Sequence, residues 1–436
     1  MKRSDTLLIG LMLFSMFFGA GNLIFPPFLG AQSGTSFWAA MLGFIVTGVG
    51  LPFAVLYAVS LVKGGVQTIG NRVHPLFSTV FMIIVYLCIG PFLAIPRNAN
   101  VAYEMGVEPF INGFSHPTFN LYIFTSIFFG LVYFVSLNPE KMERYMSKWI
   151  TPILLISMIV LCVVGFVRLD TPLQSPTEAY ATGAFSKGFI EGYNTMDALA
   201  ALAFGIVILT SIQGRGITDR KDLTRYTLKA GLIAGGLLSL VYISLGLIGG
   251  KMAAVDTFKN GTAILSATST LLLGTSGKTL LGIIFTLACF TTVVGLTTAC
   301  GQYFSKLLKN VSYKMVVIIV TAIGFVLSNM GLEQILTFSV PFLVTAYPIT
   351  IVLIILTFLN RFFRNSRIVY GITILFTAIF AIIGGLASTG LHLGYLQSVI
   401  SYLPFASIGL EWIVPALVGL LIGLVVSRFK TTQQDL

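Results

Sequence analysis

The sequence predicts an all-α integral membrane protein with twelve transmembrane helices. Hydrophobic residues make up 56% of the 436-residue chain and charged residues only 9%, whereas charged residues are about 25% of a typical soluble domain. Apolar runs long enough to cross a bilayer, which takes about 20 residues in a helix, recur along the whole chain. The alternation of basic residues between the loops agrees with this count.

Twelve apolar segments can be identified in order along the chain. They cover residues 7–29, 37–62, 76–98, 118–137, 149–168, 190–212, 226–250, 277–304, 314–329, 333–357, 368–389 and 410–428. An even number places both termini on one side, and Lys2 and Arg3 indicate that this side is the cytoplasm. The first apolar run is too long for the core of a cleavable signal peptide, so we expect it to remain as a helix.

The loops test this orientation independently. The predicted inner loops hold all 26 lysines and arginines except Arg97, Arg168, Lys187, Lys251, Lys259 and Lys278. Such a bias is typical of the cytoplasmic side of membrane proteins. It also accounts for the net charge of +11, so no nucleic-acid partner is expected. The sequence indicates a lipid bilayer as surroundings and does not specify an oligomeric state.

The first segment contains an interruption at membrane depth. It reads Phe17-Phe18-Gly19-Ala20-Gly21-Asn22-Leu23-Ile24-Phe25-Pro26-Pro27. Two glycines and a polar asparagine weaken the helix, and the two prolines remove backbone donors. A kinked anchor helix and a discontinuous helix that binds a ligand both fit these residues, because irregular backbone in a membrane is tolerated where it lines a cavity.

The sixth segment is interrupted in a similar way. Its outer half is polar, from Glu191 to Asp197, and small residues then lead to Gly205. If residues 5–170 repeat as residues 188–357, segments one and six correspond, and an odd number of segments inverts the second copy. Residues 366–430 would add two helices to this single domain of residues 1–436. Matching interruptions in inverted halves indicate a transporter's central site, although coincidence among 44 glycines is the alternative.

A broken helix exposes backbone groups of both polarities. Free N–H groups at the start of one half-helix attract carboxylates, and free C=O groups at the end of the other attract cations. An α-amino acid carries both charges on one carbon. A pair of broken helices therefore suits an amino acid without any fixed side-chain charge.

The eighth segment holds a candidate cation site. In a helix the carbonyl of Ala288 lies near the side chains of Thr291 and Thr292. Neutral oxygens of this kind suit a monovalent hard cation such as Na⁺. The alternative is that each threonine bonds its own preceding turn, as threonines in membrane helices often do.

Other chemistry-bearing residues give weaker signals. The sequence has neither an HExxH nor a GxSxG motif, so no enzyme is expected. Arg97 either extends to the membrane interface or acts at depth, and Asp197 could pair with it as an outer gate or couple transport to protons.

Several motifs together carry a family resemblance. They are the stretch Phe17 to Pro27, Gly90-Pro91-Phe92-Leu93-Ala94-Ile95-Pro96-Arg97-Asn98-Ala99, Glu191-Gly192-Tyr193-Asn194-Thr195-Met196-Asp197-Ala198-Leu199-Ala200, and Phe204-Gly205-Ile206-Val207. Across essentially the whole chain the sequence resembles the bacterial branched-chain amino acid carriers, which are cation symporters for leucine, isoleucine and valine. The resemblance implies the leucine-transporter fold of the amino acid–polyamine–organocation superfamily.

The resemblance also implies a substrate site. The Gly-x-Gly-Asn pattern of that fold matches Gly19, Ala20, Gly21 and Asn22, and it implies contacts between the substrate carboxylate and the backbone near Ala20 and Gly21. Phe204 matches an aromatic lid over the substrate side chain. Ala201 and the hydroxyl of Tyr86 complete the implied substrate set.

The sodium site implied by the resemblance uses five residues. They are the backbone carbonyls of Ser15 and Phe18, together with Ala288, Thr291 and Thr292. A second sodium site would use Asn22 and an oxygen near Leu199, which has none, so a second ion is not expected.

These features predict Na⁺-coupled symport of branched-chain amino acids into the cell by alternating access. The protein would lie in the bacterial cell membrane with both termini in the cytoplasm. Proton coupling through Asp197 and a passive channel are the alternatives that the sequence leaves open.

Overall fold

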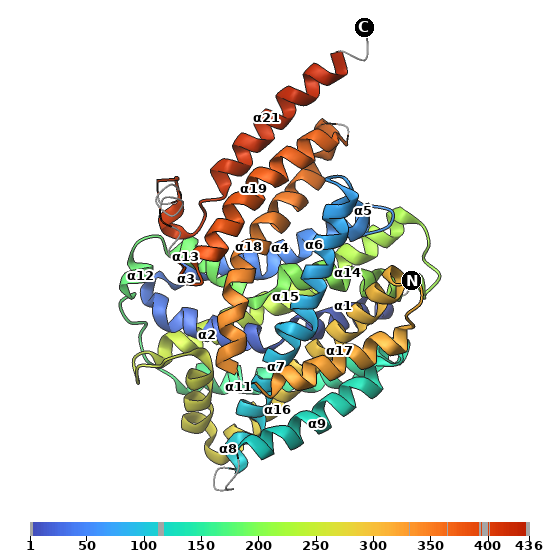
Figure 1. Ribbon diagram of the computed structural model, residues 1–436. Coiled ribbons are helices and arrows are strands. Elements are labelled where there is room, and N and C mark those ends of the chain that lie inside the picture. The colour runs from blue at the N-terminus through green and yellow to red at the C-terminus, as the bar shows by residue number, and fades with distance from the viewer. Residues whose placement is uncertain are drawn as a thin grey trace.

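The computed structural model describes residues 3–111, 117–330, 332–363, 365–391 and 402–432, with residues 394 and 400. All regular elements in these residues are helical (Figure 1). The predicted all-α class is therefore correct for the described part of the chain. Lys2, which supports the predicted orientation, lies outside it.

The helices follow one another with short connections. Up to residue 168 they are α1 (Arg3–Phe17), α2 (Ala20–Ser33), η1 (Gly34–Ser36), α3 (Phe37–Ile45), η2 (Val46–Gly50), α4 (Leu51–Leu61), α5 (Val66–Asn71), α6 (Pro75–Leu87), η3 (Cys88–Phe92), α7 (Ala94–Gly106), α8 (Glu108–Ile111), α9 (Pro117–Ser136), α10 (Pro139–Tyr145), η4 (Met146–Ile150) and α11 (Thr151–Arg168). Beyond it they are α12 (Glu178–Ala181), α13 (Ala184–Glu191), η5 (Gly192–Thr195), α14 (Asp197–Gln213), α15 (Arg220–Met252), α16 (Gly261–Leu307), α17 (Tyr313–Ser328), α18 (Leu332–Leu359), η6 (Asn360–Phe362), α19 (Arg367–Ala387), η7 (Ala406–Ile408) and α21 (Ile413–Thr432).

Eight helical stretches of the described residues are long and apolar enough to cross a membrane, or nine when the bent pair 184–195 and 197–213 counts as one. Three further apolar helices are shorter, at residues 4–17, 313–328 and 413–429. One of the eight stretches runs from residue 20 to residue 61, although the sequence divides this region between two predicted segments. The chain is thus a multi-pass helical membrane protein, and the count of twelve remains a prediction.

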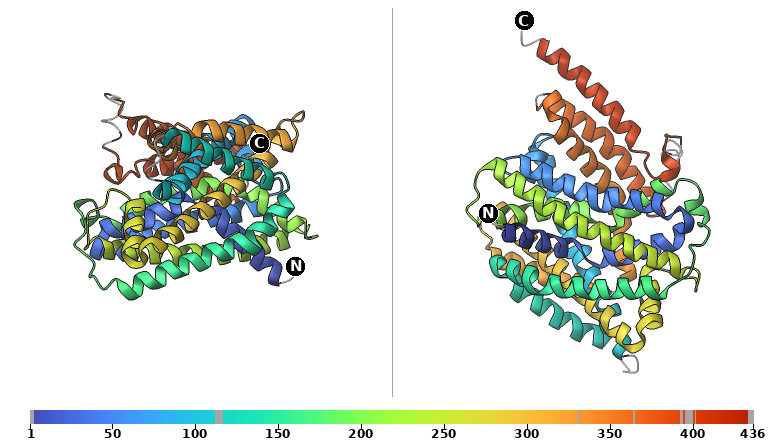
Figure 2. Two further views of the ribbon diagram at one scale, coloured as in Figure 1. Left: turned by 90° about the horizontal axis from the view of Figure 1, so that it is seen from below. Right: turned by 180° about the vertical axis from the view of Figure 1, so that it is seen from behind.

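The centre of the protein is built around α15 and α16. Helix α15 lies along α1 and α2, while α16 packs against α7, α2 and α1. Figure 2 shows α15 running across the molecule and α21 extending from one side, where it lies against α19. The functional residues described below therefore lie on central helices, away from this peripheral pair.

Helices α2 and α15 approach until their backbones touch. A Cβ atom on Gly30 would lie 1.8 Å from the carbonyl oxygen of Gly246, and one on Gly249 would lie 1.9 Å from that of Pro27. Lipid tails are as apolar as side chains, so helices in a membrane associate largely through such close packing of small residues. This contact fixes α2, and with it the adjoining helix break.

The chain leaves helical geometry between α1 and α2. Helix α1 ends at Phe17, Gly19 adopts an extended conformation with φ −117° and ψ −160°, and α2 begins at Ala20. The interruption lies at the Gly-Ala-Gly-Asn stretch that the sequence singles out.

The second interruption lies elsewhere than expected. Helix α14 runs through Gly205 without a break, and the chain turns instead at Met196, with φ +65° and a bend of 45° between the flanking helices. A Cβ on Gly205 would lie 2.8 Å from Val59 Cγ1, so this glycine allows α14 to approach α4. The break thus lies within the polar stretch from Glu191 to Asp197, and Gly205, up to which the sequence extends the interruption, is not part of it.

Candidate functional site

The break between α1 and α2 is held by two asparagine side chains. The N–H of Gly19 donates to Asn22 Oδ1 at 3.0 Å, and the N–H of Ala20 donates to Asn98 Oδ1 at 2.9 Å. These amides begin a helix and have no partner within it. The Asn98 oxygen thus occupies, on Ala20, the position that the sequence predicts for a substrate carboxylate oxygen.

Asn22 also joins the break to the start of α14. Its Nδ2 donates to Asp197 Oδ2 at 2.5 Å and contacts Tyr242 Oη, and Tyr242 Oη donates to the same carboxylate oxygen at 3.2 Å. Asn22, Asp197 and Tyr242 are all buried. A buried carboxylate costs free energy unless it is hydrogen-bonded, and here Asn22 and Tyr242 supply those bonds. Asn22 therefore stabilises both interruptions together.

Three of the predicted sodium ligands meet at α1 and α16. Thr291 Oγ1 lies 2.8 Å from the carbonyl oxygen of Ser15 and 3.0 Å from that of Ala288. It also lies 3.0 Å from Leu287 O, and because Leu287 and Ala288 both belong to its preceding turn, the alternative of a bond within the helix fits this geometry too. These oxygens belong to the end of α1 and the middle of α16, and an ion there would touch both helices.

Thr292 completes this side of the break. Its Oγ1 is buried without a hydrogen-bond partner among the described residues. A Cβ on Gly19 would lie 2.8 Å from it, so the hydroxyl faces the interrupted backbone. Phe18, whose carbonyl is the fifth predicted ligand, is buried between the two helices of the break. An unpaired buried hydroxyl costs about 1–3 kcal/mol, and a cation would satisfy it.

A small central cavity lies against the break. Its volume is about 20 Å³, which is enough for about one water-sized sphere and too small for an amino acid. All of Gly19, Ala20, Gly21 and Asn22 line it, with Arg97, Asn98, Asp197, Ala200 and Thr292 among the others. The break thus forms the wall of a closed cavity at the centre of the protein.

Phe204 and Ala201 lie behind this cavity. Both are buried, and the Phe204 ring packs edge-on against Phe17 with 5.1 Å between ring centroids. Neither lines the central cavity, where Ala200 of the same helix faces it instead. Their predicted contact with the substrate would require this aromatic pair to separate.

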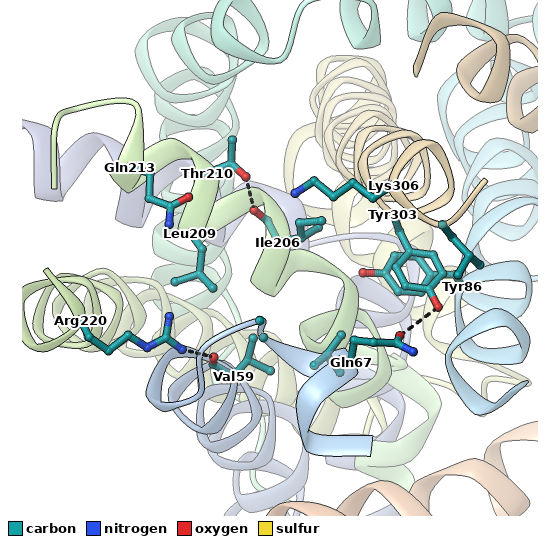
Figure 3. A pocket seen from close by; sticks show the side chains of 14 residues that line it. Val59, Gln67, Tyr86, Ile206, Leu209, Thr210, Gln213, Arg220, Tyr303 and Lys306 are labelled. Carbon is teal, nitrogen blue, oxygen red and sulfur yellow. Dashed lines mark hydrogen bonds between the residues drawn. The ribbon is translucent and has the colours of Figure 1, made fainter. Parts of the chain in front are cut away.

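Tyr86 lies at a different cavity, which we call the inner cavity. Its volume is about 370 Å³, and Gln213, Arg220 and Lys306, which the sequence places toward the cytoplasm, line it. Figure 3 shows Tyr86 beside Tyr303, and the two rings stack with centroids 4.0 Å apart. Of the described residues, none lines both this cavity and the central one. The structure does not bring Tyr86 together with the helix break.

Sequence reasoning did not identify Asn98, Tyr242 or Tyr347 as site residues. Asn98 stood within a motif that carries the family resemblance, and its position one residue after Arg97 was the available signal. Tyr347 Oη accepts from the N–H of Ala198 at 3.4 Å, at the first turn of α14. The two tyrosines come from distant helices, and their sequence context carries no signal of this role.

An ion pair connects the predicted inner loop after α14 to α10. Arg215 Nη1 donates to Glu143 Oε2 at 3.1 Å, and Nη2 pairs with the other carboxylate oxygen. Arg215 also donates to the carbonyl of Ser211 at 2.8 Å. The hydrogen bond to Glu143 raises the pKa of Arg215 above its ordinary value. The loop is therefore attached to α10, in the first half of the chain.

Replacing Arg215 with glutamine is expected to lower the free energy of unfolding by about 1 kcal/mol, because a partly buried ion pair with two hydrogen bonds contributes more to stability than an exposed one. Thermal denaturation in detergent would measure the change. Arg144→Gln removes the same charge from an exposed position beside Glu143 and serves as control. The double variant Arg215→Glu/Glu143→Arg should restore stability. If its loss of stability equalled the sum of the losses of the two single variants, the pairing would be contradicted.

Comparison with known proteins tests the family resemblance that the sequence shows. Residues 2–430 match the family described as branched-chain amino acid transport protein. The chain is 42% identical to the branched-chain amino acid permease BraB of Bacillus subtilis, over 98% of this chain and 96% of that protein. It is 36% identical to the branched-chain amino acid permease BrnQ of Escherichia coli, over 98% of this chain and 97% of that protein.

Solved structures show the same fold at low sequence identity. The nucleobase-cation-symport-1 family transporter Mhp1, in a closed conformation with bromovinylhydantoin bound, aligns with a TM-score of 0.66 at 14% identity, over 98% of this chain and 93% of Mhp1. MhsT in complex with L-phenylalanine aligns with a TM-score of 0.52 at 17% identity, over 98% of both chains.

Proposed function

The chain belongs to the branched-chain amino acid transport protein family, and we propose that it couples the uptake of leucine, isoleucine and valine to inward movement of Na⁺. As a member of this family it is a transporter rather than an enzyme, and a multi-pass protein of a bacterial membrane. The observation that carries the sodium proposal is the meeting of Ser15 O, Ala288 O and Thr291 Oγ1 beside the break.

The proposed topology has twelve membrane crossings. It counts α1 with α2 and α13 with α14 as two discontinuous crossings, and it includes the short helices α17 and α21. Residues 5–170 and 188–357 would form the two inverted repeats, residues 366–430 the additional pair, and both termini would lie in the cytoplasm. The interruptions at Gly19 and at Met196 support the pairing of the first and sixth crossings.

The proposed substrate site uses the amides at the start of α2. The carboxylate of the amino acid would replace Asn98 Oδ1 on the N–H of Ala20, and Gly19, Gly21 and Asn22 would frame it. The side chain would reach toward Phe204 and Ala201 as the central cavity widens. Tyr86, which lines the inner cavity, would contact the substrate there, on its way to the cytoplasm. Because burial gains about 0.8 kcal/mol per CH₂, we expect similar affinities for the three branched substrates.

Proteoliposomes test this proposal directly. Labelled leucine, isoleucine, valine and alanine would be offered under a Na⁺ gradient and, separately, under an H⁺ gradient. We expect concentrative uptake of the three branched amino acids with Na⁺. Equilibration down the substrate gradient alone would identify a passive channel, and absence of uptake would overturn the assignment.

Proton coupling is a second candidate, which the position of Asp197 favours. The carboxylate is buried, lines the central cavity and receives hydrogen bonds from Asn22 and Tyr242. A carboxylate at membrane depth is a functional candidate by default.

Asp197→Asn separates these two candidates. If Na⁺ is the coupling ion, the variant should still show Na⁺-driven accumulation, with a rate lowered by the weakened Asn22–Tyr242 network. The measurement is leucine accumulation under each gradient, with Asp170→Asn, which neutralises an exposed carboxylate, as the control. Loss of all concentrative uptake with retained leucine exchange would support proton coupling instead.

A further inference from the structure

A third cavity, which we call the outer cavity, lies on the opposite side of the break from the inner cavity. Its volume is about 340 Å³, within the range of sites that hold small molecules. Asn260 and Thr262, which line it, belong to a stretch that the sequence places outside the cell. The outer cavity therefore lies toward the side from which a solute outside the cell would enter.

The lining of the outer cavity is divided by chemistry. Phe25, Phe28 and Val340 give it an apolar wall, while Arg97 and Glu104 bring one charge of each sign. An amino acid with an aliphatic side chain presents the same three features, namely an apolar group, a carboxylate and an ammonium. The lining of the cavity therefore has a counterpart for each of the three groups of such an amino acid.

Arg97 is part of the wall between the outer and the central cavity. Together with Gly21 it lines both. The side chain is only 4% exposed, and its Nε has no hydrogen-bond partner among the described residues. Its Nη1 donates to the carbonyl oxygen of Asn194 at 3.1 Å, across the gap between α7 and η5. A buried guanidinium with an unpaired N–H is prepared to accept an anion.

Glycine at position 21 makes this arrangement possible. A Cβ there would lie 2.9 Å from Arg97 Nη2 and 3.2 Å from Asn194 O. The guanidinium therefore rests directly on the backbone of α2, next to the amides proposed for the central site. The inner side differs, since the Phe17–Phe204 pair lies behind the central cavity there. The wall that Arg97 forms between the outer and the central cavity is therefore thinner than the wall between the central and the inner cavity, which share no lining residue among those described.

We propose that the outer cavity is a loading site, in which Arg97 binds the α-carboxylate of the incoming amino acid before it reaches the central site. This rests on the proposed function of amino acid uptake. The aliphatic side chain lies against Phe25 and Phe28, and the ammonium faces Glu104. A carboxylate forms a stronger, two-point bond with a guanidinium than the neutral Asn194 carbonyl does. Binding therefore draws Arg97 from Asn194 and opens the wall.

The first test fills the outer cavity without touching the central one. Val340→Trp narrows the cavity, and Val255→Trp places the same side chain at a similarly exposed valine that does not line it. In cells that lack their own branched-chain carriers, Val340→Trp should raise the KM for leucine uptake at least about tenfold, and Val255→Trp should match the wild type. An unchanged KM for Val340→Trp, or an equal rise in the control, would overturn the loading site.

The second test determines whether the outer cavity recognises the carboxylate of the substrate. 4-Methylpentanoate, which is leucine without its amino group, should inhibit uptake competitively, whereas 3-methylbutylamine, which has no carboxylate, should inhibit far less. Val340→Trp should relieve the inhibition by 4-methylpentanoate. Arg97→Gln should abolish it where the variant still transports, and Arg97→Lys should retain part of it. Equal inhibition of the wild type and Val340→Trp would contradict the proposal.

These outcomes are separable from failure of the proposed function. If the wild type accumulates no branched-chain amino acid under any gradient, the transport proposal fails. If it does accumulate leucine while Val340→Trp keeps the wild-type KM and inhibition, only the loading site fails.

Discussion

Replacing Thr291 and Thr292 together with valine is expected to abolish the stimulation of leucine uptake by Na⁺. The variant removes the Oγ1 that contacts Ser15 O and Ala288 O, and the Thr292 hydroxyl that is buried without a partner among the described residues. Each contact of an oxygen with a charged group contributes about 1.5–3 kcal/mol. Loss of two should weaken Na⁺ binding by a factor of about 100 or more.

The matched control lies about one and a half turns along the same helix. Thr297 is fully buried, and its Oγ1 also has no hydrogen-bond partner among the described residues, yet it is not one of the predicted ligands. Thr297→Val should leave the Na⁺ dependence of initial uptake rates unchanged. If both variants lost Na⁺ stimulation equally, or if the double valine variant kept it, the proposed site would be wrong.

Replacing Gly249 with alanine is expected to lower the stability of the folded protein by about 3 kcal/mol or more. The added Cβ would lie 1.9 Å from the carbonyl oxygen of Pro27, so α15 must move away from α2. Overpacking of this kind typically costs about 1–3 kcal/mol, and here the obstacle is backbone, which cannot rotate aside. Thermal denaturation of the purified protein would measure the loss.

Gly236 supplies the comparison on the same helix. A Cβ at Gly236 meets no atom within 4 Å, so Gly236→Ala should be neutral or stabilise α15 by up to about 1 kcal/mol. Gly249→Ala should also slow transport by the fraction of the protein that still folds, because a displaced α2 would move the helix break at its start. Equal stability of the two variants would show that the α2–α15 contact does not hold the helices together.

The first interruption could be predicted because its residues are unusual for a membrane helix. Gly19, Gly21 and Asn22 stand together in an apolar run, and the structure leaves helical geometry at that place. The second interruption could not be located in this way. Met196 has a positive φ, which is uncommon for a residue other than glycine, so only the polar stretch around it, from Glu191 to Asp197, pointed to this region. Gly205 attracted the prediction because a glycine needed for packing looks the same in a sequence as one needed for a turn.

The polar partners of the site lay further beyond sequence reasoning. Asn98 reaches Ala20 from 78 positions away, and Tyr242 reaches Asn22 from 220 positions away. Residues this distant meet only through the packing of whole helices. Thr291 was identified because its partner Ala288 lies one turn earlier in the same helix, where the spacing itself predicts proximity.

The oxygens gathered at the proposed sodium site have a consequence for the energetics of the cell. The backbone carbonyls of Ser15 and Ala288 and the hydroxyls of Thr291 and Thr292 bear no formal charge. An ion held by them keeps its full positive charge during the crossing, while the zwitterionic amino acid adds none. In the proposed Na⁺ symport the membrane potential would therefore act on the cycle, at about 2.3 kcal/mol per charge for each 100 mV. A cell with an interior-negative membrane could concentrate these amino acids electrically, even where the sodium concentrations on its two sides are equal.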